Sequence, residues 1–177
     1  MSTSTNLNTG NLNDVNLEAV AGLAGKVQEN PEVADTVWQA TVTWNGAFRS
    51  SAQVRQFAPL ASDEPVGLGG TDTAPNPVEQ LLGALGNCLA VGYAANASAA
   101  GIEIRSLSID LAGDLNLKTF LGLEPQGNAG YQGITVDVHL DADASPEQLA
   151  TLHEAVVGTS PVGHTLQRPV PVQIRLV

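Results

Sequence analysis

The sequence predicts an α+β fold in which strands precede and follow one long helix. Three observations support this prediction: an Asn-Gly hairpin signal within residues 37–57, a capped apolar helix over residues 76–101, and two alternating strand patterns after it. A second helix and a closing strand complete the order. Because strands and helices do not alternate as regular β-α-β units, the pattern is typical of an α+β protein.

The length of 177 residues predicts one domain preceded by an arm, and 43% hydrophobic residues are enough for a core. Residues 1–16 are rich in Asn, Thr and Ser, so we expect a flexible arm ahead of a single domain over residues 17–177. Within residues 17–34, apolar positions follow the helical period until Asn30 and Pro31, which predicts a short N-terminal helix.

Charge and cysteine content exclude several classes of partner. Lys and Arg total 7 against 18 Asp and Glu, so neither nucleic acid nor a membrane surface is an expected partner. The single cysteine excludes an internal disulfide, and the chain has neither a basic apolar leader nor an apolar run long enough for a membrane span. We therefore expect a soluble cytoplasmic protein.

Residues 37–57 predict a β-hairpin. Asn45-Gly46 is typical of a two-residue type I′ turn, and such a turn would place Val42 opposite Arg49. Directly opposed residues share a face of a sheet, so Arg49 is expected on the face that bears the tryptophans, and Arg55 has the same parity at the strand end. Solvated strand arginines remain the alternative interpretation.

The next segment, residues 58–75, has the composition of a loop. Its glycines match neither a phosphate-binding loop nor a dinucleotide fingerprint, so we expect a flexible entry loop.

Residues 76–101 predict the central helix. Asn76 is a good N-cap, Pro77 suits the first helical position, Glu79 completes a capping-box-like arrangement and Gly101 ends the helix. Apolar side chains recur at steps of three and four, and Cys88 lies in that stripe. The second half is mostly Ala, Gly and Ser, so another backbone can approach it closely.

Shorter elements follow. Alternating apolar residues predict strands over 102–111 and 130–140, with residues 113–122 as a continuation or a turn. Ser followed by Pro is a helix-start signal at two places, Ser145 for a helix that ends near Gly158 and Ser160 for one short turn. Residues 170–177 alternate again and predict a closing strand.

Cys88 is the candidate nucleophile, with an inert small hydrophobe as the alternative. It lies about twelve residues into the helix, too far from the N-terminus for the helix dipole to stabilise a thiolate, so it needs an arginine from elsewhere in the chain. Arg49 is the best-placed candidate. Besides capping the helix, Glu79 can hold such an arginine through a charge-assisted pair.

No metal or cofactor is expected, because the three histidines are scattered without the spacing of zinc sites. Ser160 and His164 could be imagined as nucleophile and base of a serine hydrolase. Ser160 before Pro161 is explained more simply as an N-cap, and no oxyanion loop is found.

The chain resembles the OsmC/Ohr family from about residue 37 to its end. The similarity lies in the stretch from Gly69 to Ala90, which contains Ala-Leu-Gly-Asn-Cys88-Leu, in Gly113-Asp-Leu-Asn-Leu, in Ser160-Pro-Val and in Arg168-Pro-Val-Pro-Val. The helix motif is specific when it is combined with the Ser-Pro-Val turn. This resemblance implies antiparallel sheets wrapped around long central helices in an intertwined homodimer.

The resemblance also implies reduction of hydroperoxides. In that family a peroxidatic cysteine in the central helix attacks the peroxide and becomes a sulfenic acid, which a second cysteine resolves as a disulfide. Cys88 matches the first cysteine. In the family, an arginine from the early hairpin activates the thiolate, and a glutamate near the helix start orients that arginine. Arg49 is the first candidate for the arginine and Arg55 the second. Glu79 is the candidate for the glutamate.

Two positions depart from the family pattern. Ser160 stands at the position of the resolving cysteine, so turnover requires an external thiol reductant. Glu79 lies one residue later than the family's glutamate, which rotates its carboxylate by ~100° around the helix. We therefore expect thiol-dependent reduction of organic hydroperoxides through Cys88. The alternative is a non-catalytic OsmC-like dimer that binds a small apolar ligand in the cleft between subunits.

Overall fold

The computed structural model describes residues 11–177 and confirms a mixed α+β fold. The described residues divide into two compact units, residues 19–83 and the combination of residues 11–18 with 84–177. The central helix, α2 (Pro77–Ala99), belongs to both. Most of the expected flexible arm, residues 1–10, lies outside the described residues.

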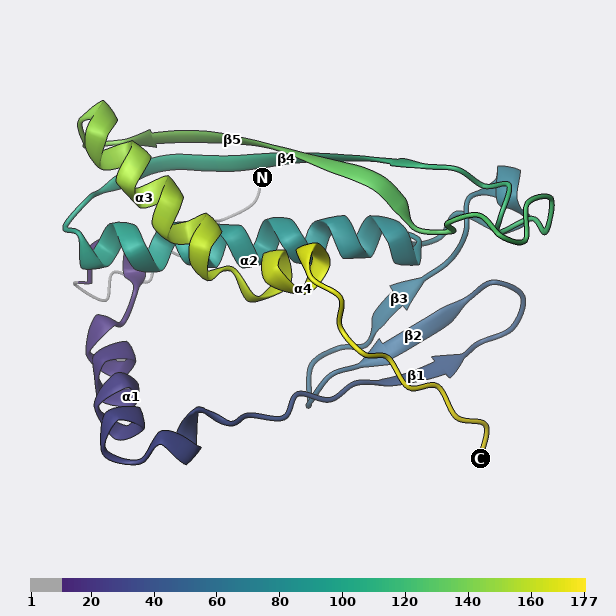
Figure 1. Ribbon diagram of the computed structural model, residues 1–177, viewed down its shortest axis with the longest axis horizontal. Coiled ribbons are helices and arrows are strands. Elements are labelled where there is room, and N and C mark those ends of the chain that lie inside the picture. Colours follow the sequence, from purple (N-terminus) through teal and green to yellow (C-terminus); the bar gives the residue numbers. More distant parts are fainter. Residues whose placement is uncertain (1–10) are drawn as a thin grey trace. The chain divides into compact units, whose positions relative to one another are not determined.

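The elements follow one another as shown in Figure 1. Helices are α1 (Leu17–Glu29), α2 (Pro77–Ala99), α3 (Pro146–Thr159) and α4 (Pro161–Gln167), with short 3₁₀ turns at Leu12–Asp14, Pro31–Ala34 and Val66–Leu68. Strands are β1 (Thr41–Trp44), β2 (Ser50–Gln53), β3 (Leu60–Ser62), β4 (Ile104–Leu115) and β5 (Tyr131–Ala142).

The predicted hairpin forms, but its predicted register is wrong. Val42 lies opposite Ala52, three residues beyond its expected partner Arg49, and Trp44 lies opposite Ser50. Because Arg49 directly precedes Ser50, it lies on the face opposite to the one that carries Val42 and Trp44. The expectation that Arg49 shares the tryptophan face is therefore contradicted.

The turn explains the change of register. Asn45 is not a turn centre but part of the last pair, since its N–H donates to the Arg49 carbonyl at 2.8 Å. The positive φ angles fall instead on Gly46 at 90° and Ala47 at 49°. The loop begins one residue later than predicted, at Gly46, and extends to Phe48, so it is also longer than two residues. The two changes together move the opposing strand to the observed register.

The loop before α2 is more ordered than its composition predicts. Residues 60–62 form β3, which pairs with β2. Asp63, only 1% exposed, accepts hydrogen bonds from the N–H and hydroxyl groups of Thr71 and Thr73 and from the Glu64 N–H. The Thr71 hydroxyl, followed by the Thr73 and Glu64 donors, lowers the pKa of Asp63 well below its usual range, although burial acts against this.

The central helix starts and ends as predicted. Asn76 Oδ1 accepts from the Glu79 N–H at 2.9 Å, and Glu79 Oε2 accepts from the Asn76 N–H at 2.8 Å. This is a reciprocal capping box that satisfies two backbone donors at the helix start. Gly101 follows the last turn with a φ of 71°, a conformation that favours glycine.

The core of the unit that contains residues 84–177 lies between α2, α3 and the antiparallel β4–β5 ribbon (Figure 1). Two glycines of α2 permit close packing: a Cβ at Gly86 would lie 2.8 Å from Leu111 in β4, and one at Gly92 would lie 2.9 Å from Val156 in α3. The buried hydrophobic residues of this core are Leu85, Leu89, Tyr93, Ala97, Ile102, Ala142, Leu152 and Val156.

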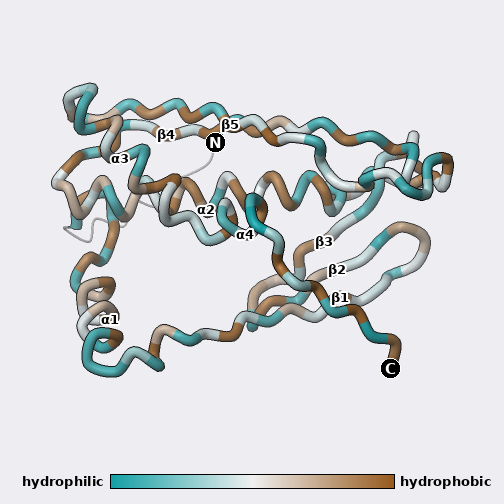
Figure 2. Tube along the Cα trace, viewed as in Figure 1, coloured by the Kyte–Doolittle hydropathy of each residue, from teal (hydrophilic) through white to brown (hydrophobic). Residues whose placement is uncertain are grey.

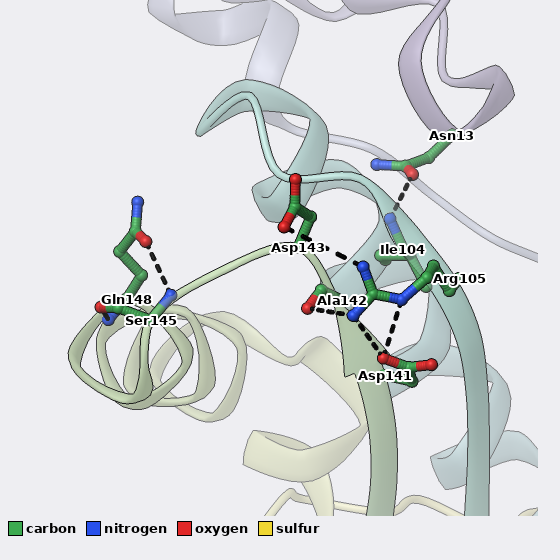
Figure 3. Close-up of polar contacts among 8 residues, drawn as sticks. All are labelled: Asn13, Ile104, Arg105, Asp141, Ala142, Asp143, Ser145 and Gln148. Atoms are coloured by element: carbon green, nitrogen blue, oxygen red, sulfur yellow. Dashed lines mark hydrogen bonds and ion pairs between the residues drawn. The ribbon is translucent and has the colours of Figure 1, made fainter.

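Polar contacts hold one end of this ribbon, where the start of β4 pairs with the end of β5 (Figure 3). The Asn13 side chain accepts from the Ile104 N–H at 2.9 Å, which attaches the N-terminal segment to the start of β4. Arg105 donates to the Asp141 carboxylate at 2.7 Å and to the Ala142 carbonyl at 3.0 Å. The hydrogen bond between the two side chains, together with their opposite charges, raises the pKa of Arg105 and lowers that of Asp141.

Both Ser-Pro helix starts are confirmed, whereas the closing strand is not. Ser145 forms a capping box with Gln148, and Ser160 caps α4. Residues 170–177 have no strand partner among residues 11–177 and form no regular structure. The alternating pattern is real, as Figure 2 shows, but its apolar side chains point into solvent, with Ile174 92% exposed. A strand cannot form without a neighbour that satisfies its backbone groups.

No helix formed by residues 11–177 combines the length and apolar character needed to cross a bilayer.

Candidate active site

The candidate nucleophile, Cys88, lies on α2 three residues after the buried Leu85 and directly before the buried Leu89, and it is free and partly exposed. Its sulfur lies 3.4 Å from the hydroxyl oxygen of Ser160. This contact spans 72 residues of sequence and joins the central helix to the junction of α3 and α4.

The packing of α3 along α2 brings Ser160 to this position. Val156 fills the space left by Gly92, and the Tyr93 hydroxyl makes a short hydrogen bond with His153 Nδ1. Tyr93 is 2% exposed, and its burial raises the pKa of its phenol. These contacts direct the C-terminal end of α3 back toward Cys88.

Ser160 has two contacts at once. Its side-chain oxygen accepts from the Gly163 N–H at 3.1 Å, which is the N-cap bond of α4 that the sequence predicts. The same oxygen faces the Cys88 sulfur, and the serine is buried. Sequence reasoning identified Ser160 as a cap and as the position of the missing cysteine. It did not predict the hydrogen bond to Cys88, although the Ser-Pro-Val motif is a signal for that proximity.

The other predicted site residues, Arg49, Arg55 and Glu79, lie in the unit formed by residues 19–83. Arg49 is exposed next to the hairpin turn, and Arg55 is exposed with its guanidinium 4.6 Å from the centre of the Phe57 ring. Glu79 is exposed at the start of α2, where its carboxylate accepts the capping-box hydrogen bond from Asn76. The capping interpretation of Glu79 is thus confirmed, and the catalytic roles of Arg49, Arg55 and Glu79 stay predictions.

The arrangement of Cys88 and Ser160 suits nucleophilic sulfur chemistry that does not end in an internal disulfide. A cysteine can be oxidised to a sulfenic acid and then forms a disulfide with a second thiol. The group next to the Cys88 sulfur is a hydroxyl, and the chain has one cysteine, so the second thiol must come from another molecule.

The chain is similar to known proteins in sequence and in fold. The family model described as OsmC-like protein matches residues 70–175. Similar solved structures include an OsmC-like protein from Mycoplasma pneumoniae, with a TM-score of 0.65 and 21% identity over 75% of this chain and 89% of that chain. An organic hydroperoxide resistance protein OsmC from Legionella pneumophila has a TM-score of 0.58 and 14% identity over 75% and 92% of the two chains.

An organic hydroperoxide resistance protein from Elizabethkingia anophelis is also similar, with a TM-score of 0.56 and 17% identity over 75% of this chain and 91% of that one. No curated protein matches the sequence. The structural likenesses show the fold, and the family model covers more than half of the chain, including both Cys88 and Ser160. The chain therefore belongs to the OsmC-like family.

Proposed function

We propose that this protein reduces organic hydroperoxides through Cys88 and that an external thiol completes each cycle. The observation that carries the proposal is the position of the one cysteine, a partly exposed thiol on the central helix in contact with the Ser160 hydroxyl. Membership of the OsmC-like family supports it, and two of the similar structures are named organic hydroperoxide resistance proteins.

The proposed cycle has three steps. The Cys88 thiolate attacks one peroxide oxygen, the O–O bond breaks, and the alkoxide takes up a proton and leaves as an alcohol, which gives a sulfenic acid. An external thiol then displaces the hydroxyl of the sulfenic acid, which leaves as water, and forms a mixed disulfide. A second external thiol attacks that disulfide and releases Cys88. The net reaction reduces one hydroperoxide and oxidises two thiols to a disulfide. A cytoplasmic setting would supply such thiols.

A thiolate at Cys88 is expected to need a cation, and the hairpin arginines are the candidates. The observed register removes the reason to prefer Arg49 over Arg55. We therefore propose that one of these two arginines activates Cys88 and that Glu79 orients that arginine. Apolar neighbours such as Leu85 and Leu89 favour an alkyl hydroperoxide over a strongly hydrated oxidant.

We also propose that the working form is an intertwined homodimer. The apolar face of the C-terminal segment alternates with polar residues in strand fashion, and yet Val172, Ile174 and Leu176 are exposed. Val42 and Trp44, which share one face of the hairpin, are exposed as well. Surfaces of this kind are typical of interfaces, and a second copy of the chain is the proposed cover.

A second candidate function is the binding of a small apolar ligand. An open pocket of about 500 Å³ lies between the C-terminal end of α2 and the first half of α3, and Ala99, Ile102 and Leu152 contribute to its mainly apolar lining. This volume suits a small molecule. The pocket contains neither Cys88 nor Ser160, so occupation of it need not change the thiol.

A turnover assay tests the proposed reaction. An alkyl hydroperoxide and a small dithiol are mixed with the protein, and the loss of peroxide is compared between the native chain and Cys88→Ser. We expect catalytic loss with the native protein and none above background with Cys88→Ser. If both proteins leave the peroxide intact while an apolar ligand binds each equally well, the binding function replaces the enzymatic one.

A further inference from the structure

We propose that Ser160 donates its hydroxyl hydrogen to the Cys88 sulfur and thereby stabilises the thiolate. The inference rests on the proposed function for what the thiolate does, but the hydrogen bond itself is a property of the resting protein. It assigns a new role to a turn that, in the resemblance described above, carries a resolving cysteine. In this chain the same turn stabilises the thiolate that attacks the peroxide, whereas a resolving cysteine would form the disulfide after that attack.

The direction of the hydrogen bond follows from the groups that surround the Ser160 oxygen. A serine hydroxyl has one hydrogen to donate and two lone pairs that accept. One lone pair accepts from the Gly163 N–H at 3.1 Å, and the Cys88 sulfur lies 3.4 Å away. A thiolate has no hydrogen, so once Cys88 is ionised the sulfur can only accept and Ser160 must donate.

The backbone holds the donor in place. Ser160 is the N-cap of α4 with Pro161 at the first helical position, and the cap bond fixes the serine side chain. A Cβ at position 163 would lie 3.0 Å from the Ser160 oxygen and 3.1 Å from its Cβ, so glycine lets the N–H approach this closely. Because the donor is already ordered, little entropy is lost when it binds the thiolate.

The surroundings make this hydrogen bond effective. Ser160 is 5% exposed, and hydrogen bonds away from water are stronger than those in it. The β4–β5 ribbon faces α2 with apolar side chains, while Asp110, Asp114, Asp137, His139 and Asp141 lie on its exposed side. The titratable side chains on α3 and α4 are Glu147, His153, Glu154 and His164.

The pH dependence of Cys88 alkylation tests the donor. Because the chain has one cysteine, the rate with iodoacetamide reports the Cys88 thiolate alone. In Ser160→Ala and Ser160→Gly we expect the midpoint of the rate curve to move to higher pH by about one unit, which lowers the rate below the midpoint about tenfold. Ser160→Thr keeps the hydroxyl and should retain the native curve.

Two comparisons separate this role from a structural one. Glycine caps a helix almost as well as serine whereas alanine does not, so Ser160→Gly should fold even if Ser160→Ala is unstable. Ser145→Ala removes the equivalent cap from α3, far from the sulfur in sequence, and should leave the curve unchanged. The proposal is overturned if folded Ser160→Gly alkylates as the native protein does, or if Ser145→Ala shifts the curve equally.

The outcome is distinguishable from failure of the proposed function. A native protein that never forms a sulfenic acid with an alkyl hydroperoxide would refute the peroxidase reaction, while the alkylation curves would still decide whether Ser160 donates to the sulfur. If both hold, Ser160→Gly should also lower the rate of peroxide attack about tenfold at a pH below the midpoint.

Discussion

At the level of single residues, Asp63 determines the conformation of the segment that leads into the central helix. Its carboxylate accepts hydrogen bonds from Thr71 and Thr73, which lie 8 and 10 residues later in the chain, and from the neighbouring Glu64 N–H. A carboxylate that accepts several hydrogen bonds is strongly favoured in its charged form. One buried side chain therefore closes the loop that the glycine-rich composition would otherwise leave open.

Replacing this carboxylate should open the loop. Asp63→Asn keeps the size of the side chain but places an NH₂ group where at least one donor points, so hydroxyl and amide donors lose their acceptor. We expect the amide hydrogens of Thr71 and Thr73 to lose hydrogen-exchange protection while those of the β4–β5 ribbon keep theirs. Unchanged protection at Thr71 and Thr73 would show that the loop does not depend on Asp63.

The same group should make the loop sensitive to acid. The pKa of Asp63 is lower in the folded protein than its ordinary value of ~3.9, so its contribution to stability is complete above that value and is lost as the pH falls below it. Protection factors at Thr71 and Thr73 should therefore decline between about pH 4 and pH 2. Asp63→Asn should show no such decline.

At the level of elements, Glu79 has a structural role and a proposed catalytic role at the start of α2. Its carboxylate closes the capping box with Asn76, and it is also the proposed partner of an arginine. The two roles make different demands, since a glutamine can complete a capping box but carries no charge to hold an arginine.

A pair of variants separates these roles. Asn76→Ala should destabilise the protein by about 1 kcal/mol, because the Glu79 N–H loses its acceptor. Glu79→Gln should change stability little, but if Glu79 orients an arginine it should lower kcat/KM for peroxide reduction at least about tenfold. Chemical unfolding and the turnover assay provide the two measurements. Full activity in Glu79→Gln would leave Glu79 with its cap alone.

The sequence was sufficient for elements whose signals are local. Caps at Asn76, Ser145 and Ser160 depend on residues at most three positions apart, so their composition was enough to predict helix starts. The register of the hairpin was not predictable in this way. The Asn45-Gly46 signal predicts positive φ angles at these two residues, but the structure has them at Gly46 and Ala47. The contact of Cys88 with Ser160 depends on the packing of α3, which no local pattern contains.

At the level of the whole molecule, the C-terminal segment connects the fold to the proposed assembly. Its alternating pattern predicted a strand, and among the described residues no neighbour completes it. Exposed Val172, Ile174 and Leu176 leave apolar surface in water, which a partner chain could cover. A strand pattern that has no strand partner among residues 11–177 is typical of a strand that pairs with another chain.

Removal of this segment should weaken the dimer. We expect the native chain to have the mass of a dimer by light scattering, and a chain shortened after Arg168 to shift toward the monomer. A matched variant, Gln173→Ser, keeps the apolar side of the segment and should remain dimeric. A native protein that stays monomeric at high concentration would contradict the proposed assembly.

The most direct test of the central claim is the mass of Cys88 after one equivalent of an alkyl hydroperoxide. We expect the protein to gain one oxygen atom, dimedone to trap this species at Cys88, and a small thiol to return the original mass through a mixed disulfide. A thiol that keeps its original mass, with no dimedone adduct, would contradict the claim that Cys88 reduces peroxides.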